Sequence, residues 1–391
     1  MEDEQVMASD IIIAGAGFAG LAAVKSLRDL ARNRKDVAVR LFDVRSNTTM
    51  VPALPDLAGG RFPDVYLKGE ISRLVSDPVI FNRERISAID LDEKEVRAET
   101  GSYRYDYLVI ACGSVTDFFG FNQRLDAVHK LDSIEDANRL CRDLDEYIGR
   151  CARPTVFVAG GGYTGMELAC SVKSRAPGAR VSVVELKEKI LPSMQDWARD
   201  YVTAQAEKKG IDLITGTSVK SFDGTNLELS DGRNFKDVFL CWSTGTKCSV
   251  SIISGDVEQA RDGRLTVDSC LRVPGYPEVY AVGDSAAFRD RGKVLRKSVN
   301  FARDQGKHAG RNICRSMESR KQEDYHPVDL GWVIPFCDVG AGMIPGRRRI
   351  TGRLPLALHY FFCGLRNYSF RNILFFWKTA GAALFRDRET Q

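Results

Sequence analysis

The sequence predicts an α/β fold in which two open, mainly parallel sheets are followed by a helical C-terminal segment. Three observations predict it. A short apolar strand, a glycine-rich turn and an amphipathic helix follow one another near the start of the chain, and the same order recurs from about residue 155. Strands that alternate with helices are typical of parallel-sheet domains. The third observation is a C-terminal stretch in which aromatic side chains are interleaved with arginines.

Composition limits the functions that the chain can have. Its 391 residues leave room for two or three domains, and a hydrophobic fraction of 44% is typical of a globular protein. The net charge of +4 is too small to indicate a nucleic-acid partner. Four histidines and ten scattered cysteines, with no C-x-x-C pair, argue against a metal site. We expect the cysteines to be reduced and mostly buried.

The first glycine motif, G-x-G-x-x-G, follows the apolar strand Ile11–Ile13. Gly15 permits the tight turn, Gly17 lets the backbone approach a pyrophosphate, and Gly20 lets the next helix pack closely on the strand. The free N–H groups and the dipole at the start of that helix favour a bound anion. The sequence therefore predicts a dinucleotide site, with candidate contacts at Gly15, Gly17, Phe18, Ala19 and Gly20.

An acid follows this motif at the spacing that a dinucleotide site requires. The strand VAVRLFD ends in Asp43, about 20 residues after the last glycine, where a carboxylate can accept hydrogen bonds from a ribose diol. Arg45 is a further candidate contact. A solvated acid at a strand end is the alternative interpretation of Asp43.

The same arrangement recurs in the segment PTVFVAGGGYTGMELACSV, and the strand ARVSVVEL after it ends in Glu185. Two such units predict two dinucleotides. Glu185 would repel a 2′-phosphate, which favours NADH over NADPH, although Lys187 and Lys189 weaken that preference. The candidate contacts are Gly160, Gly162, Tyr163, Thr164, Gly165 and Glu185.

Three further segments combine a strand with a turn of small residues. Residues 105–114 and 237–246 allow the chain to cross beside a bound dinucleotide. Residues 278–286 form a strand that ends in Gly-Asp, where the acid can accept hydrogen bonds from the ribityl hydroxyls of a flavin. These segments add Cys112, Gly113, Thr244, Gly245, Gly283 and Asp284 to the candidate contacts.

Together these motifs resemble the FAD/NAD two-dinucleotide flavoprotein superfamily over roughly Asp10 to Asn312. The resemblance implies two Rossmann-like domains, with FAD on the first motif and NADH on the second. The FAD-binding domain would comprise residues 1–120 and 263–322. Residues 121–262 would bind NADH, and residues 323–391 would form a C-terminal membrane and quinone-site segment.

Within that superfamily the chain resembles the type II NADH dehydrogenases, the single-subunit NADH:quinone oxidoreductases. The resemblance is carried by a short segment ending in LAGG, by the second motif GGGYTGMELA and by the basic, aromatic C-terminus. The redox C-x-x-x-x-C of the disulfide reductases is missing from RSNTTMVPALPDLAGG, where those enzymes have it. Electrons would therefore pass directly from the flavin to an acceptor.

The resemblance also implies three catalytic residues. Glu167 would lie near the nicotinamide and the flavin and relay protons to a quinone; a helix-surface acid is the alternative. The family's Ala-Gln-x-Ala-x-Gln stretch is replaced by VNFARDQG, where Asn300 could still offer an amide but Asp304 introduces a charge. Lys378 aligns loosely with a family lysine near the quinone end of the flavin, and an exposed lysine is the other interpretation.

The C-terminal stretch has the properties of an amphipathic segment in a membrane interface. Its longest part without charged residues, Leu354–Leu365, is too short to span a bilayer. Aromatic rings favour the depth of the lipid headgroups, and Arg347–Arg349 and Arg353 would attract anionic lipid. A dimer interface or a layer over the core is the alternative, because aromatic residues and arginine also mark protein interfaces.

These observations predict a FAD-dependent NADH dehydrogenase that passes two electrons to a menaquinone- or ubiquinone-type membrane quinone without pumping protons. We expect a cytoplasmic protein, peripherally bound to the cytoplasmic face of the cell membrane, and the sequence is also compatible with a homodimer. Three alternatives stay open. A sulfide:quinone oxidoreductase would need a cysteine partner for Cys337, which the sequence does not indicate. The others are a soluble NADH-dependent reductase of a small redox protein and a slow-turnover redox-sensing flavoprotein.

Overall fold

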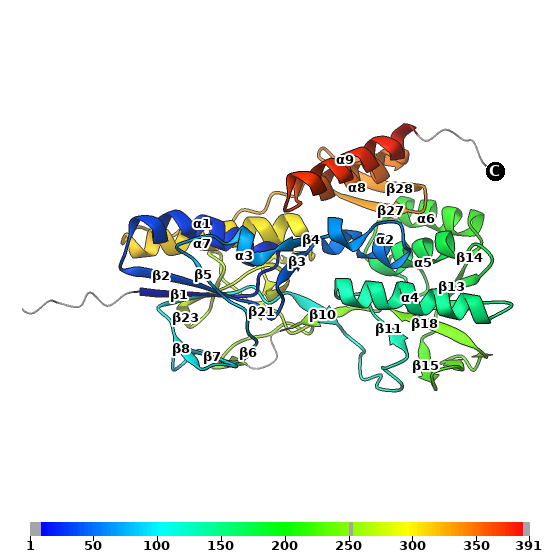
Figure 1. Ribbon diagram of the computed structural model, residues 1–391, viewed down its shortest axis with the longest axis horizontal. Helices are drawn as coiled ribbons and strands as arrows, with labels where there is room; N and C mark the ends of the chain where they lie inside the picture. The colour runs from blue at the N-terminus through cyan, green and yellow to red at the C-terminus, as the bar shows by residue number, and fades with distance from the viewer. Residues whose placement is uncertain (1–8, 250–252, 386–391) are drawn as a thin grey trace, which may run out of the picture. The chain divides into compact units, whose positions relative to one another are not determined.

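The computed structural model describes residues 9–249 and 253–385, which form two compact units (Figure 1). The described parts of residues 1–48, 69–115 and 246–329 form the first unit, and those of 49–68, 116–245 and 330–391 form the second. Each unit contains a mainly parallel sheet with helices packed on it, so the predicted α/β class is confirmed. The predicted domain boundaries stay predictions, because compactness does not show which residues bind a cofactor.

The main sheet of the first unit has six strands in the order β22-β23-β9-β1-β2-β5. The central strand β1 (Ser9–Ala14) pairs in parallel with β2 (Val37–Phe42) and β9 (Tyr107–Ile110). Helices on a parallel sheet bury its strands, which explains the unbroken apolar run of β1. The remaining strands are β5 (Ile80–Asn82), β22 (Arg272–Val273) and β23 (Tyr276–Ala281).

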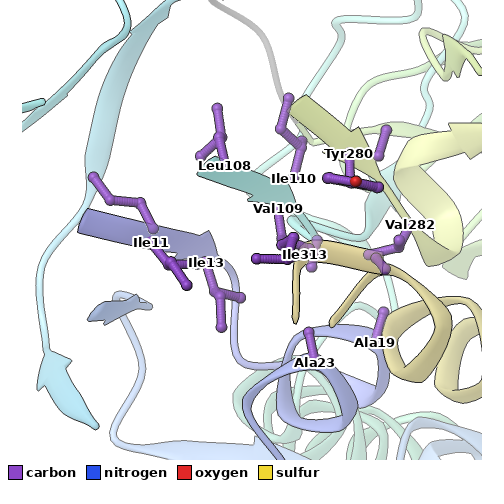
Figure 2. Close-up of a cluster of buried hydrophobic side chains, with 14 of the residues drawn as sticks. Ile11, Ile13, Ala19, Ala23, Leu108, Val109, Ile110, Tyr280, Val282 and Ile313 are labelled. Atoms are coloured by element: carbon purple, nitrogen blue, oxygen red, sulfur yellow. The ribbon is translucent and has the colours of Figure 1, made fainter. Parts of the chain in front are cut away.

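Helices α1 (Phe18–Asn33) and α7 (Val299–Met317) lie side by side in this unit (Figure 1). They approach closely because a Cβ at Gly306 of α7 would overlap the backbone of Ala19 in α1. Figure 2 shows the buried cluster that helices and strands form together. Its labelled members are Ile11, Ile13, Ala19, Ala23, Leu108, Val109, Ile110, Tyr280, Val282 and Ile313.

Several short elements complete the first unit. A four-stranded sheet contains β20 (Ile253–Ser254), β6 (Ile86–Asp90), β7 (Glu95–Ala98) and β8 (Ser102–Arg104). The others are α3 (Ile71–Leu74), β21 (Leu265–Thr266), η3 (Gly283–Ser285), β24 (Ala286–Ala287), β25 (Arg289–Asp290) and β26 (Lys293–Val294). Where the chain passes from one unit to the other it forms β3 (Asn47–Thr49), β4 (Lys68–Glu70), β10 (Ser114–Thr116) and β19 (Thr246–Cys248).

The second unit is built on five parallel strands in the order β11-β18-β12-β13-β14. These are β11 (Val128–His129), β18 (Val238–Trp242), β12 (Thr155–Ala159), β13 (Arg180–Glu185) and β14 (Ile211–Thr215). The helices are α4 (Ile134–Arg150), α5 (Tyr163–Arg175), α6 (Asp196–Lys208) and α2 (Leu54–Ala58), with 3-10 turns η1 (Val51–Ala53) and η2 (Asp64–Tyr66). An antiparallel sheet adds β15 (Val219–Phe222), β16 (Leu227–Leu229) and β17 (Asn234–Phe235).

The last part of the second unit is an antiparallel sheet followed by two helices that pack on each other. The strands are β27 (Trp332–Phe336), β28 (Val339–Ile344) and β29 (Arg348–Gly352). The helices are α8 (Arg353–Leu365) and α9 (Phe370–Phe385), coloured orange to red in Figure 1. None of the helices in the described part of the chain is both long and apolar enough to cross a membrane.

A disulfide joins Cys170 of α5 to Cys337, which lies between β27 and β28. The expectation of reduced cysteines is therefore wrong for this pair. Cys337 therefore has a cysteine partner. The sequence did not indicate this partner because the two residues are 167 positions apart. The eight other cysteines, which all lie in the described residues, form no disulfide.

Candidate functional site

The first glycine motif forms a tight turn between β1 and α1. Gly15 has φ 106°, in the region that favours glycine, and a Cβ there would overlap the carbonyl oxygen of Ala111. A Cβ at Gly20 would overlap the Gly15 carbonyl oxygen, which explains why α1 can start so close to the strand. A Cβ at Gly17 would meet nothing within 4 Å. The turn therefore has no room for a side chain at Gly15 or Gly20, and it has free space beside Gly17.

Asp43 connects the end of β2 to this turn. Its Oδ2 accepts a hydrogen bond from the Ala16 N–H (2.8 Å), and its Oδ1 accepts one from the Arg45 N–H (2.9 Å). The Arg45 guanidinium donates to both oxygens, at 3.0 and 2.9 Å. Burial raises the pKa of Asp43, but Arg45 and the backbone donors outweigh it and hold the pKa below its usual value. Asp43 is thus a buried, fixed acceptor and not a solvated acid.

The second glycine motif repeats this geometry between β12 and α5. Gly160 has φ 103°, and a Cβ there would overlap the Ser243 carbonyl oxygen. A Cβ at Gly165 would overlap the Gly160 carbonyl oxygen, while one at Gly162 would meet nothing within 4 Å. In both turns, therefore, the first and third glycines have no room for a side chain and the middle glycine has free space beside it.

Glu185 accepts a hydrogen bond from the second turn, as Asp43 does from the first. Its Oε2 accepts a hydrogen bond from the Gly161 N–H (2.8 Å), and its Oε1 accepts one from the Lys187 N–H (2.9 Å). Of the neighbouring candidates, Thr164 is exposed, and the Tyr163 hydroxyl donates to the Val333 carbonyl (2.7 Å).

Both turns fit the pyrophosphate of a dinucleotide. Gly17 and Gly162 are the N-caps of α1 and α5 and supply no side-chain cap, so each helix starts beside open space. Backbone N–H groups at a helix start bind anions. A carboxylate at the next strand end is suited to ribose hydroxyls, and Asp43 and Glu185 occupy that place. The residues of each unit are therefore suited to hold one dinucleotide.

A second turn of the first unit is formed by Gly283 and Asp284 after β23. Asp284 accepts a hydrogen bond from the Ser114 hydroxyl at 2.7 Å. The Gly283 N–H donates to Gln305 Oε1, also at 2.7 Å. Gln305 is 3% exposed, and the sequence did not single it out because a glutamine inside a helix forms no recognisable motif. The structure therefore brings Asp284 together with Ser114, a contact that the sequence did not predict, and Gln305 supports the neighbouring Gly283.

Cys112 and Gly113 form the turn after β9. The Gly113 N–H donates to the Ser285 hydroxyl (3.3 Å), and the Cys112 thiol lies 3.4 Å from the Ala14 carbonyl oxygen. Burial raises the pKa of Cys112 to about 12, so the thiol stays neutral. Cys112 supports the turn and is not poised as a nucleophile.

Thr244 and Gly245 follow β18 in the second unit. The Thr244 hydroxyl donates to the Asp117 carbonyl (3.2 Å), and the Asp117 N–H donates to the Gly245 carbonyl (2.9 Å). A Cβ at Gly245 would lie 3.0 Å from the ring of Phe119. The small residues thus allow two segments to cross closely, and their contact with a nicotinamide stays a prediction.

Glu167 lies on α5, just after the second motif, and is partly buried. Burial, followed by the nearby charge of Asp56, raises its pKa well above the usual value. A carboxyl in such an environment can hold a proton near neutral pH, as a general acid or base must. The interpretation as an ordinary helix-surface acid does not agree with this environment.

The other two predicted catalytic residues lie in different units. Asn300 is in the first turn of α7, whose N-cap Ser298 accepts a hydrogen bond from the Phe301 N–H (3.3 Å). Asp304, one turn later, is exposed. Lys378 lies on α9 of the second unit and is exposed. Their roles at a quinone site stay predictions.

Sequence reasoning missed an ion pair whose buried acid, Asp56, acts electrostatically on Glu167. Asp56 is the third residue of α2, and its carboxylate accepts hydrogen bonds from Arg61 and from Tyr360 of α8. Asp56 and Tyr360 are 304 residues apart, and no local pattern joins them. The contact between Asp56 and Tyr360 is a property of the tertiary structure.

The chain is similar to curated type II NADH:quinone oxidoreductases. That of Staphylococcus haemolyticus is 26% identical, over 88% of this chain and 91% of the relative. That of Staphylococcus aureus is 25% identical, over 86% and 90%.

Solved structures share the fold. NDH2 from Plasmodium falciparum, determined in complex with NADH, gives a TM-score of 0.82 at 16% identity and covers 96% of this chain and 98% of its own. The sulfide:quinone oxidoreductase of Aquifex aeolicus gives 0.74 at 19% identity, over 97% and 95%. A family profile described as pyridine nucleotide-disulphide oxidoreductase matches residues 9–306. Because this match covers most of the sequence, the chain belongs to the pyridine nucleotide-disulphide oxidoreductase family.

Proposed function

We propose that this chain is a FAD-dependent NADH:quinone oxidoreductase that does not pump protons. One observation carries the proposal: two pyrophosphate cradles of the same geometry lie on one chain, one in each unit. Two cradles serve two dinucleotides, as a flavoprotein that oxidises NADH requires. Similarity to type II NADH:quinone oxidoreductases over nearly the whole chain supports a quinone as acceptor.

In this proposal the first unit binds FAD. Gly15 and Gly17 place backbone N–H groups at the pyrophosphate, and Asp43 accepts hydrogen bonds from the adenine ribose. Asp284, fixed by the Ser114 hydroxyl, accepts from the ribityl chain. Bound FAD supplies the two-electron chemistry that links NADH to a quinone. The protein's own groups bind, orient and neutralise charge.

The second unit binds NADH. Gly162 leaves room for the pyrophosphate at the start of α5, and Glu185 is aligned by two backbone N–H groups to accept from the adenine ribose. Its negative charge disfavours the 2′-phosphate of NADPH.

The residues proposed for quinone reduction supply protons and orientation. A quinone that accepts two electrons also takes up two protons to become a quinol. Glu167 holds a proton in a partly buried carboxyl and can donate it. Asn300 can donate an amide hydrogen bond to a quinone carbonyl, and Lys378 contributes a positive charge.

The helical pair α8–α9 is the proposed membrane-facing surface. Arginines of the pair lie on aromatic rings, with Arg366 4.9 Å from the ring centre of Phe362 in α8 and Arg371 5.0 Å from that of Tyr66 in η2. Exposed apolar side chains beside cations fit a segment in the membrane interface, here the cytoplasmic face. A second copy of the chain is the alternative occupant. The exposed apolar residues of the pair are Leu354, Phe361, Leu365, Phe370, Leu374, Trp377, Leu384 and Phe385.

Rapid-mixing spectroscopy of the purified yellow protein tests the proposal. We expect NADH to bleach the flavin much faster than NADPH does, and a panel of menaquinone and ubiquinone analogues to restore the colour. Sulfide should leave the flavin oxidised. Rapid bleaching by NADH with negligible reoxidation by every quinone would instead indicate a redox sensor, and a colourless protein unable to take up flavin would contradict the proposal altogether.

A further inference from the structure

A polar triangle in the second unit is formed by Asp56 of α2, by Arg61, which follows α2, and by Tyr360 of α8. Arg61 Nη1 donates to Asp56 Oδ1 (2.8 Å) and to the Tyr360 hydroxyl (2.7 Å). That hydroxyl donates to the same Oδ1 at 3.1 Å. Asp56 is 6% exposed and Tyr360 2%. Because a buried carboxylate is costly unless it is paired, these donors hold Asp56 in one place and favour its charged form.

The helix that carries Asp56, α2, packs on α5, the helix that carries Glu167. Gly59, which follows α2, lies so close that a Cβ on it would be 2.8 Å from the Ser171 Cβ. A Cβ on Gly60 would overlap the guanidinium of Arg175, one turn further along α5. The end of α2 therefore lies close against α5 at Ser171.

One turn before these contacts, the same segments carry Asp56 and Glu167. The two carboxyls interact, since the charge of Asp56 is the second cause, after burial, of the raised pKa of Glu167. Burial also raises the pKa of Asp56, against the effect of Arg61. Two acids in a poorly solvated place do not readily carry two charges, so the pair retains a proton. The bond to Arg61 places the charge on Asp56 and the proton on Glu167.

The other titratable groups around the pair do not supply a competing charge. On α8, burial lowers the pKa of His359 to about 4, and burial raises the pKa of the Cys363 thiol, so both are neutral at pH 7. Arg366 acts electrostatically on these two groups. Beyond Gly60, Arg175 is paired with Asp145 of α4. Arg61 is thus the cation bonded to Asp56.

We propose that Asp56, held by Arg61 and Tyr360, is a positioning residue that keeps the proton on Glu167 until quinone reduction takes it up. Asp56 itself touches neither substrate nor cofactor in this account and acts through Glu167. The inference rests on the proposed function, in which Glu167 donates a proton to the quinone. After donation, Glu167 is left as a carboxylate and takes its next proton from solvent.

Asp56→Asn tests the proposal, because it removes the charge and keeps the size of the side chain. Glu167 should then lose its proton more easily. We expect the alkaline limb of the pH profile of NADH:quinone turnover to move at least about one pH unit lower. An infrared band from a protonated carboxyl in the oxidised enzyme should titrate away with the same shift, and Glu167→Gln should remove that band.

Asp64→Asn is the matched control, since Asp64 lies on the same segment, partly exposed and paired with Lys68 (2.8 Å). It should leave both the pH profile and the infrared band unchanged. If Asp56→Asn fails to fold, as judged by flavin content, Tyr360→Phe keeps the ring and removes one donor from Asp56. It should shift both readouts in the same direction by a smaller amount.

The two readouts separate failure of this inference from failure of the proposed function. A folded Asp56→Asn enzyme with the wild-type profile and band would overturn the coupling. If the band shifts as expected while Glu167→Gln turns over quinone at the wild-type rate, the coupling stands and the role of Glu167 in turnover is wrong.

Discussion

Gly17 and Gly162 occupy equivalent places in the two units, and the protein itself puts nothing within 4 Å of a Cβ at either one. Alanine is therefore tolerated by the fold but meets a pyrophosphate that approaches the backbone. We predict that Gly17→Ala lowers the flavin content of the purified protein at least about tenfold at limiting FAD, a loss of about 1.4 kcal/mol. Gly162→Ala should keep its flavin and raise the KM for NADH by a similar factor.

Each of these variants is the control for the other. Circular dichroism and thermal unfolding of the flavin-free proteins should match the wild type, because neither Cβ meets another atom. Loss of flavin from Gly162→Ala with retention in Gly17→Ala would reverse the assignment of the two cradles.

Glu185 carries a prediction about the choice of coenzyme. Glu185→Ala removes an acceptor that is held by the Gly161 and Lys187 N–H groups. A hydrogen bond to a charged group contributes about 1.5–3 kcal/mol, so the KM for NADH should rise roughly tenfold or more, while NADPH binding improves as the repulsion disappears. Exposed Glu188, replaced by alanine, is the matched control. Unchanged KM values for both coenzymes would remove Glu185 from the site.

Single residues also show where sequence is informative. Asp43 and Glu185 could be predicted because each follows a glycine motif at a fixed spacing along one βαβ unit. Asp56 could not, because its environment is set by Tyr360, 304 residues away, and by the packing of α2 on α5. Buried polar partners of this kind depend on tertiary contacts that no local pattern encodes.

At the scale of elements, the disulfide between α5 and the β27–β28 turn is the clearest departure from expectation. It closes a loop of 167 residues and so restricts the unfolded chain strongly. We predict that Cys337→Ser lowers the free energy of unfolding by about 2–5 kcal/mol. Denaturant unfolding without reductant measures this, and peptide mapping should recover residues 170 and 337 in one linked pair.

Cys151, a partly exposed free cysteine, provides the control. Cys151→Ser should unfold as the wild type does, and added reductant should bring the wild type to the stability of Cys337→Ser. Recovery of both cysteines as free thiols from the native protein would contradict the assigned bridge.

Elements repeated along the chain were easier to predict than elements joined across it. Both parallel sheets follow from strand, glycine turn and helix in order, and the apolar strands β1 and β12 are buried as expected. The sheet β27–β29 was not predicted, because its strands contain exposed, basic and glycine residues without strict alternation. It is stabilised instead by contacts with α5, α6 and α8.

At the scale of the whole molecule, segments distant in sequence join one compact unit. Residues 49–68 belong with 116–245 and the C-terminal region, although the sequence places them inside the first dinucleotide-binding region. Aromatic contacts with the C-terminal helices explain this. Phe62 packs edge-to-face on Tyr360 and Phe376, and Tyr66 stacks on Phe375 with ring centres 3.8 Å apart. The aromatic residues of α8 and α9 therefore fall into two groups. Some are buried in the core of the unit, and the others are exposed at the surface.

The exposed apolar residues of α8 and α9 form the proposed membrane surface. Phe370 is 73% exposed on α9, and burying such a side chain in lipid contributes about 1.5–3 kcal/mol. Phe370→Ser should therefore weaken binding to vesicles that contain anionic lipid by roughly tenfold or more in a flotation assay. Phe119→Ser removes an equally exposed ring (70%) from a segment outside the tail and should bind as the wild type does. Wild-type protein that stays unbound at low salt, but sediments as a dimer that Phe370→Ser dissociates, would assign this surface to a second copy of the chain.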